Sequence, residues 1–189
     1  MRLELGGFFQ WTHRWRIKLR PSFISTNIMM LALYVHSYAQ PSIHYSYAVF
    51  VQSFARYSSW PVSPSGFKVV VVGNTKAYDE IVKSVAGKVI AGSAATVVKN
   101  DDDDASIEDA SIIYIADGAS NQLSQLLKVT DGKPVMIIAE REGLHKKGAA
   151  MSFIVINSKL KFDINMKELD KRNLKISAQL TALANNILE

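Results

Sequence analysis

Cysteine is absent from this chain of 189 residues. That absence excludes a disulfide framework and thiol redox chemistry. Histidine is almost as scarce, because beyond residue 39 the sequence contains only His44 and His145, far apart along the chain. A histidine-based metal site needs clustered ligands. The sequence therefore predicts no metal site and no cofactor.

Catalytic and nucleotide-binding motifs are also missing. No GxSxG nucleophile elbow is present. The segment Gly73-Asn74-Thr75 follows an apolar run, where α/β sheets place ligands, but it matches neither GxGxxG nor a phosphate-binding loop with GK[ST]. The sequence thus predicts a protein that is not an enzyme, with Asn74 kept as a candidate ligand contact.

Positive charge is unevenly distributed. The sequence carries a formal net charge of +5, yet residues 1–39 hold five of the 22 basic side chains and one of the 17 acidic ones. The remaining residues are therefore close to neutral. A nucleic-acid-binding face would need basic residues clustered in the domain itself, so we predict no nucleic-acid partner. The run of aspartates at residues 101–104 lacks the spacing of a calcium loop and indicates a solvated connector.

The N-terminal segment has the pattern of a secretory signal. Basic residues at 14–20 precede an apolar run at 28–35, and Ser37 and Ala39 are small residues at positions −3 and −1 before Gln40. The apolar run is too short to span a bilayer roughly 30 Å thick. We predict cleavage between Ala39 and Gln40, export to the periplasm, and a gene start that extends beyond the signal proper. Residues 40–189 would then form the mature domain.

Helical and strand patterns alternate along the mature chain. Apolar runs predict strands at 67–72, 94–98, 112–116 and 134–139, and periodic segments predict helices at 44–58, 77–85 and 121–129. The stripe of Tyr47, Phe50, Val51 and Phe54 indicates packing on a core. Together the patterns predict an α/β fold: a single three-layer-type domain with a mostly parallel central sheet, a C-terminal hairpin and flanking helices.

The last third predicts two strands and two helices. Residues 151–156 are apolar on both faces, which predicts a strand covered from two sides. Residues 160–165 alternate, which predicts a half-exposed partner strand joined through Asn157-Ser158-Lys159. Asn165 is placed to cap a helix, with Glu168 three residues later. A final helix from about Ser177 would align one apolar stripe of four residues: Ile176, Leu180, Leu183 and Ile187.

One group of titratable residues is compact enough to act as a site. Glu140, Glu142 and His145 lie within six positions, in a segment that also contains Lys146 and Lys147. Such a segment can provide acid–base or ligand groups, or it can be a mixed-charge surface loop. Asp117, which follows the strand predicted at 112–116, joins Asn74 as a second ligand candidate at a strand end.

Two separated segments of the mature chain carry its most specific residue patterns. In the first, Phe54-Ala55 and Trp60-Pro61 end a helix, and an apolar strand then closes at Gly73. The second runs from Gly148 and Phe153 through Phe162, Ile164 and Asn165 to Leu174, Ile176 and Leu180. Both segments resemble the YfiR-type periplasmic proteins, and the second is similar to that family's Gly-x-x-x-x-Phe, x-Phe-x-Ile-Asn and Leu-Lys-Ile-Ser-x-x-Leu patterns, in the same order. Most of these side chains fall on predicted core faces, so we assign them mainly to folding.

The resemblance implies a regulatory role without chemistry. Well-understood members are periplasmic repressors of an inner-membrane diguanylate cyclase, act on its periplasmic portion and so adjust cyclic di-GMP and biofilm formation. They can self-associate, which implies a homodimer. Some carry disulfides linked to redox control, which this chain cannot form. The alternative is a periplasmic sensor module that binds a small molecule and feeds a histidine kinase or another membrane partner.

Overall fold

The structure is a computed structural model that describes residues 42–61, 66–100 and 107–189. All of these residues belong to one unit of the chain, Pro41–Glu189. The predicted signal segment with its cleavage site at Ala39 and Gln40, and the aspartate run at residues 101–104, lie outside the described residues.

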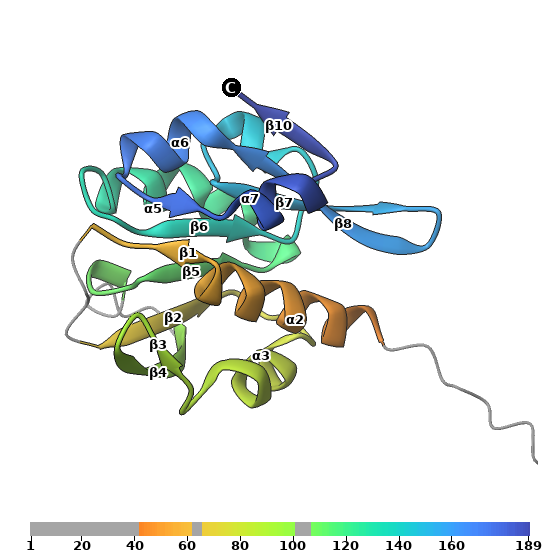
Figure 1. Ribbon diagram of the computed structural model, residues 1–189. Helices are drawn as coiled ribbons and strands as arrows, with labels where there is room; N and C mark the ends of the chain where they lie inside the picture. Colours follow the sequence, from red (N-terminus) through yellow and green to blue (C-terminus); the bar gives the residue numbers. More distant parts are fainter. Residues whose placement is uncertain (1–41, 62–65, 101–106) are drawn as a thin grey trace, which may run out of the picture. The chain divides into compact units, whose positions relative to one another are not determined.

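A sheet of eight strands forms the centre of this unit, in the order β10-β8-β7-β6-β5-β2-β4-β3 (Figure 1). Its middle is parallel, its β7–β8 and β3–β4 pairs are antiparallel, and β10 is parallel to β8. The strands are β2 (Phe67–Val72), β3 (Val89–Ile90), β4 (Ser93–Asn100), β5 (Ile112–Ile115), β6 (Met136–Ala139), β7 (Met151–Ile156), β8 (Lys159–Asn165) and β10 (Asn186–Leu188). The mixed α/β class and the mostly parallel sheet are confirmed.

Helices flank the sheet on both faces. Alternate residues of β2 separate the two cores, because Val69 and Val71 join one apolar cluster while Val70 and Val72 join the other. The first cluster includes residues of α2 (Ile43–Arg56), α3 (Tyr78–Val85), α6 (Met166–Lys171) and α7 (Ala178–Leu183). The second includes residues of α5 (Leu123–Val129) and of two short 3₁₀ helices, η2 (Asp117–Gln122) and η3 (Leu144–Lys147). The three-layer arrangement follows from this division.

Helix α2 packs its aromatic stripe on the sheet. The Ser42 side chain caps the helix by accepting a hydrogen bond from the Tyr45 amide, and the helix ends before Trp60-Pro61, as predicted. The Phe54 ring lies edge-on to the Phe162 ring at a centroid distance of 4.9 Å. Such pairs add to the stabilisation from apolar burial. Core packing of the stripe is therefore confirmed.

The β7–β8 hairpin closes through a two-residue turn. Ile156 pairs with Lys159, and the two residues between them, Asn157 and Ser158, have φ values of 50° and 60°. Positive φ at both turn positions is typical of a type I′ turn, whose twist suits a hairpin. The hairpin projects beyond the neighbouring strands (Figure 1). Only the first half of β7 is covered from both sides, since Val155 is 52% exposed.

The expectation of a half-exposed strand at 160–165 is wrong for its second half. Asp163 and Asn165 are 5% and 7% exposed, because η3 lies over this face of the sheet and β10 pairs alongside β8. Asn165 does cap α6, accepting a hydrogen bond from the Glu168 amide at 3.0 Å. The Glu168 carboxylate, however, binds Arg172 and does not complete a capping box.

The final helix is much shorter than expected. Helix α7 covers only Ala178–Leu183, and Ala184 turns into extended backbone. Ile187 then lies in β10, opposite Ile164 of β8, and Ile176 lies in the two-residue strand β9 (Lys175–Ile176), paired with β1 (Ser58–Ser59). The predicted stripe of Ile176, Leu180, Leu183 and Ile187 is therefore wrong, because pairing with distant strands replaces the helix at both ends. Leu183 is 65% exposed.

Candidate functional site

Glu140 ties together the carboxyl ends of three parallel strands. It follows β6 directly, and one carboxylate oxygen, Oε1, accepts hydrogen bonds from the hydroxyls of Thr75 and Tyr114, the latter at 2.7 Å. The other oxygen, Oε2, accepts from the Asp117 backbone N–H at 2.8 Å. Thr75 follows β2 and Tyr114 lies in β5, so the side chain cross-links β2, β5 and β6. Its charge is satisfied by protein groups, which indicates a structural role.

Tyr114 supplies a buried hydroxyl to this cross-link. Its side chain is fully buried in the core. Burial, the negative charge of Glu140 and the hydrogen bond to that carboxylate all raise the pKa of Tyr114. The tyrosine therefore stays neutral at physiological pH and donates a hydrogen bond to Glu140.

Asp117 and Asn74 lie at the same edge of the sheet, as predicted. Arg141 Nε donates a hydrogen bond to Asp117 Oδ1 at 2.8 Å, and this contact lowers the pKa of the Asp117 carboxyl. Lys99 Nζ donates to Asn74 Oδ1 at 3.2 Å. The carboxyl edge of the sheet thus gathers Asn74, Asp117 and Glu140, while Glu142 lies on the same pocket wall as Glu140.

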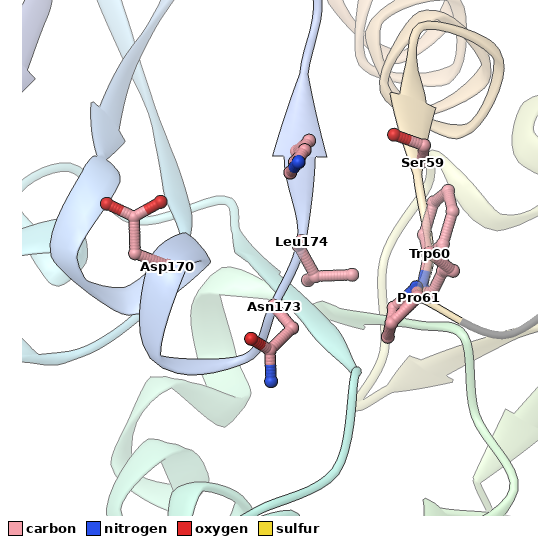
Figure 2. Close-up of a pocket in the computed structure, with 7 residues that line it drawn as sticks. Ser59, Trp60, Pro61, Asp170, Asn173 and Leu174 are labelled. Carbon is pink, nitrogen blue, oxygen red and sulfur yellow. The ribbon is translucent and has the colours of Figure 1, made fainter.

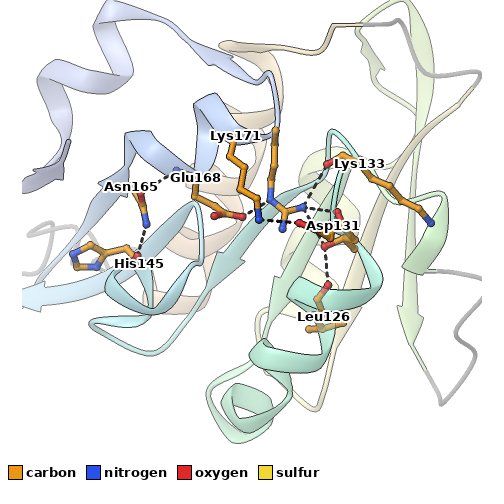
Figure 3. Close-up of polar contacts among 9 residues, drawn as sticks. Leu126, Asp131, Lys133, His145, Asn165, Glu168 and Lys171 are labelled. Carbon is orange, nitrogen blue, oxygen red and sulfur yellow. Dashed lines mark hydrogen bonds and ion pairs between the residues drawn. The ribbon is translucent and has the colours of Figure 1, made fainter.

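His145 does not belong to that edge. It is 1% exposed, and it lies in η3 over the β7–β8 pair, where Nδ1 is 2.7 Å from Ser152 Oγ and 3.7 Å from Asp163 Oδ2. Asn165 Nδ2 donates to the His145 carbonyl oxygen at 2.7 Å, and Asn185 Nδ2 donates to Asp163 Oδ1 at 2.8 Å (Figure 3 draws His145 and Asn165). The prediction of one site formed by Glu140, Glu142 and His145 is wrong for His145, because the chain turns inward at Gly143, whose φ is 79°.

The serine, histidine and aspartate of this cluster do not form a catalytic triad. A triad needs the serine at one ring nitrogen and the aspartate at the other, so that the ring can relay a proton. Here both partners approach Nδ1, and Nε2 is buried without a hydrogen-bond partner among the described residues. Ser152 itself is fully buried. Burial lowers the pKa of His145, an effect that Lys146 reinforces while Asp163 and Glu142 oppose it.

A second buried polar cluster joins α6 to the chain that follows α5. Arg172, 3% exposed, donates from Nε to Glu168 Oε1 at 2.6 Å and from Nη1 to the Thr130 carbonyl oxygen at 3.0 Å (Figure 3). The same Nη1 lies 3.1 Å from Thr130 Oγ1 and 3.4 Å from the Lys133 carbonyl oxygen. Sequence reasoning missed this cluster, because its members come from segments about 40 positions apart. The only local signal was the i, i+4 spacing of Glu168 and Arg172.

A pocket of about 470 Å³ lies between the two segments of the chain that resemble the YfiR-type proteins (Figure 2). Trp60 and Pro61 line it from one segment, and Asp170, Asn173 and Leu174 from the other. The Trp60 ring packs edge-on against Phe67 at a centroid distance of 5.0 Å. Trp60 Nε1 is buried and has no hydrogen-bond partner in the described part of the chain.

Most of the other residues that carry the family resemblance are buried apolar residues of the core, together with two glycines at close contacts between segments. Their side chains are almost fully buried: Phe54, Phe153, Phe162, Ile164, Leu174 and Leu180. The two glycines sit at positive φ in tight places. A Cβ on Gly73 would lie 2.5 Å from Ala119 Cβ, and one on Gly148 would lie 2.8 Å from Leu127 Cδ1. These positions therefore require glycine for folding.

No group of three metal-ligating side chains occurs in the described ranges. Over the same residues, no helix is long and apolar enough to cross a membrane. The fold and its polar clusters define a small α/β domain in which the buried polar groups serve mainly to join segments of the chain. The chain belongs to the YfiR/HmsC-like family, whose model matches residues 46–185. No curated protein matches the chain.

Proposed function

We propose that this protein is an exported, non-enzymatic regulator that binds a membrane signalling protein and modulates it. Family membership over residues 46–185 carries the proposal. The partner that this family favours is an inner-membrane diguanylate cyclase, contacted on its periplasmic portion, so that the protein adjusts cyclic di-GMP and biofilm formation. Such regulation needs a difference in affinity for two states of the partner and no chemistry of its own.

The site geometry supports regulation by contact. Glu140 is engaged by three protein donors, and the His145 cluster is buried with both partners at one ring nitrogen. The proposal includes a cleaved signal at residues 1–39, a periplasmic domain at 40–189, and self-association as a homodimer.

Cyclic di-GMP in living cells tests this function. Deleting the gene should raise the nucleotide if the protein represses a cyclase. Restoring the full-length gene should return the concentration to its original level, whereas a gene lacking residues 1–39 should not, because its product stays inside the cell. The proposal is refuted if the deletion strain has an unchanged concentration of cyclic di-GMP and no membrane protein is pulled down with the exported domain.

A small-molecule sensor that feeds a histidine kinase or another membrane partner is the second candidate. The pocket at Trp60 favours it, since a buried indole N–H without a partner is a donor that a ligand acceptor could satisfy. A thermal-shift screen tests it. A ligand at a hundredfold excess over its Kd should add about 2.7 kcal/mol to the free energy of unfolding. The shift should disappear in Trp60→Phe, which keeps the ring and removes the N–H.

A further inference from the structure

One edge of β7 has no neighbouring strand along its second half. Strand β6 pairs with β7 only at Met151 and Ser152. Strand β7 continues to Ile156, and no other strand of the described chain pairs with this edge. An exposed edge of this kind is a template on which another chain can add a strand.

The hairpin register determines which backbone groups face that edge. The two-residue turn makes Ile156 and Lys159 the closing hydrogen-bonded pair, so the next pair, Val155 and Leu160, is not hydrogen-bonded. The N–H and C=O of Val155 therefore point away from β8. The same alternation directs the Phe162 carbonyl to the other side of the hairpin, where it accepts a hydrogen bond from the Asn185 amide at 2.8 Å.

A pocket of about 270 Å³ runs beside the open edge. It is lined by Tyr47 of α2, by the segment from Glu140 to Glu142, and by Val155 of the strand. Val155 is an exposed apolar residue at 52%. The pocket thus combines unpaired backbone, an aromatic ring and an exposed apolar side chain, which are the features of a site that recognises an extended peptide.

The walls of this pocket are negatively charged. They carry Asp117, Glu140 and Glu142 against one guanidinium, that of Arg141. Arg141 is already paired with Asp117. The pKa of the Tyr47 hydroxyl is raised, first by burial and then by the negative charges of Glu140 and Asp117. The negative field of these carboxylates therefore reaches Tyr47. A cation placed beside the Tyr47 ring would meet both this field and the face of the ring.

We propose that the free edge of β7 binds an extended segment of a partner protein as an added strand, with a lysine or arginine of that segment seated between Tyr47 and Glu142. Backbone hydrogen bonds to Val155 would hold the segment, and the basic side chain would select it. This inference rests on the function proposed above, since it describes the surface that meets the partner.

Three synthetic peptides test the recognition directly. Each is an extended chain of alternating valine and threonine, with lysine, glutamine or glutamate at its centre. Binding to the ¹⁵N-labelled exported protein is followed by the amide signals of Phe153 and Val155. The lysine peptide should bind at least tenfold more tightly than the glutamate peptide, a difference of about 1.4 kcal/mol. The same lysine peptide with N-methyl groups on alternate amides should lose binding, because it cannot form the ladder.

Two pairs of variants locate the site. Val155→Pro removes the outward N–H and should weaken the lysine peptide at least tenfold, whereas Leu160→Pro makes the same change on the opposite edge of the hairpin and should not. Glu142→Lys should reverse the preference among the peptides, whereas Asp170→Lys, an exposed acid that lines the other pocket, should not. Spectra of each variant check that the fold is retained.

Several results would overturn the inference: equal binding of the three peptides, shifts that avoid Phe153 and Val155, or free lysine acting as well as the lysine peptide. The last would mark a pocket for a small cation. The two proposals also fail separately. If Val155→Pro and Glu142→Lys each retain a membrane partner as well as the unaltered protein does, the proposed surface is wrong and the proposed function stands. If the lysine peptide binds at β7 but deletion leaves cyclic di-GMP unchanged and no partner is recovered, the function is wrong and the surface stands.

Discussion

Replacing Arg172 by methionine should lower the free energy of unfolding of this domain more than replacing any neighbouring charged residue does. Methionine keeps an unbranched apolar side chain in the buried position and removes the guanidinium. Glu168, whose side chain is 12% exposed, would then keep its charge without the hydrogen bond at 2.6 Å. The Thr130 and Lys133 carbonyl oxygens would lose the same donor.

The expected cost follows from burial. Breaking a buried ion pair by removing one partner costs about 3–5 kcal/mol, because the remaining charge stays desolvated. Stabilities of single domains lie at about 5–15 kcal/mol, so the loss is a large fraction of the total. For a domain of this size we expect Tm to fall by roughly 6–20 °C. Urea unfolding should show a lower midpoint with an unchanged slope, since the surface exposed on unfolding is nearly the same.

Lys171 provides the matched control one position away. Its ammonium pairs with Asp131 Oδ1 at 2.8 Å, but both side chains are largely exposed, at 60% and 64%. Solvent screens exposed pairs and leaves them little net effect, so Lys171→Met should leave the urea midpoint nearly unchanged. In the double variant Arg172→Met/Glu168→Leu, part of the loss should be recovered, because no uncompensated charge remains. If Arg172→Met and Lys171→Met cost the same, burial is not the cause and the reasoning is refuted.

Two further predictions concern a glycine and the buried histidine. Gly73→Ala should lower the free energy of unfolding by about 1–3 kcal/mol from the close approach to Ala119, in addition to the strain of positive φ, as measured by urea unfolding. Gly132→Ala is the control, because Gly132 also has positive φ but has no atom within 4 Å of the added Cβ. Equal losses of stability in the two variants would contradict the clash. Because the pKa of His145 is lowered in the folded state, the unfolded state binds more protons, and stability should fall as the pH drops below the unfolded pKa of about 6.5, by at most about 1.4 kcal/mol per pH unit. His145→Gln should flatten that slope between pH 6.5 and 5, and an unaltered slope would show that another group titrates there.

The pattern of apolar residues was sufficient for most of the fold. Strand β2 and the hairpin strand β7 have the predicted bounds. Helix α2 starts one residue before and ends two residues before its predicted bounds, and α3 starts one residue late and ends at the predicted residue. These elements could be predicted because their periodicity is local and each buries a face in the core. The parallel sheet followed from the alternation of strands and helices.

The polar sites could be predicted only in part. Asn74 and Asp117 were expected at strand ends, which share an edge in a parallel sheet, and they lie there. Glu140 lies at the same edge, hydrogen-bonded to the Asp117 amide, although it was expected only with Glu142 and His145. His145 was expected with Glu140 and Glu142 because it is close to them in sequence, but the turn at Gly143 leads into η3, which holds His145 against Ser152 and Asp163. Burial of a short polar segment depends on what covers it, and a one-dimensional pattern does not contain that information.

By itself the sequence determined the α/β class, the aromatic core of α2, the capping role of Asn165 and the family resemblance, since each depends on residues at fixed local spacing. The tertiary structure decided which charges are buried, as at Arg172 and Asp163, and where pairing replaces helix, as at Ile176 and Ile187. It also decided that half of β7 has an open edge beside a negatively charged pocket. These features depend on contacts between segments distant along the chain, whose register only the folded sheet establishes.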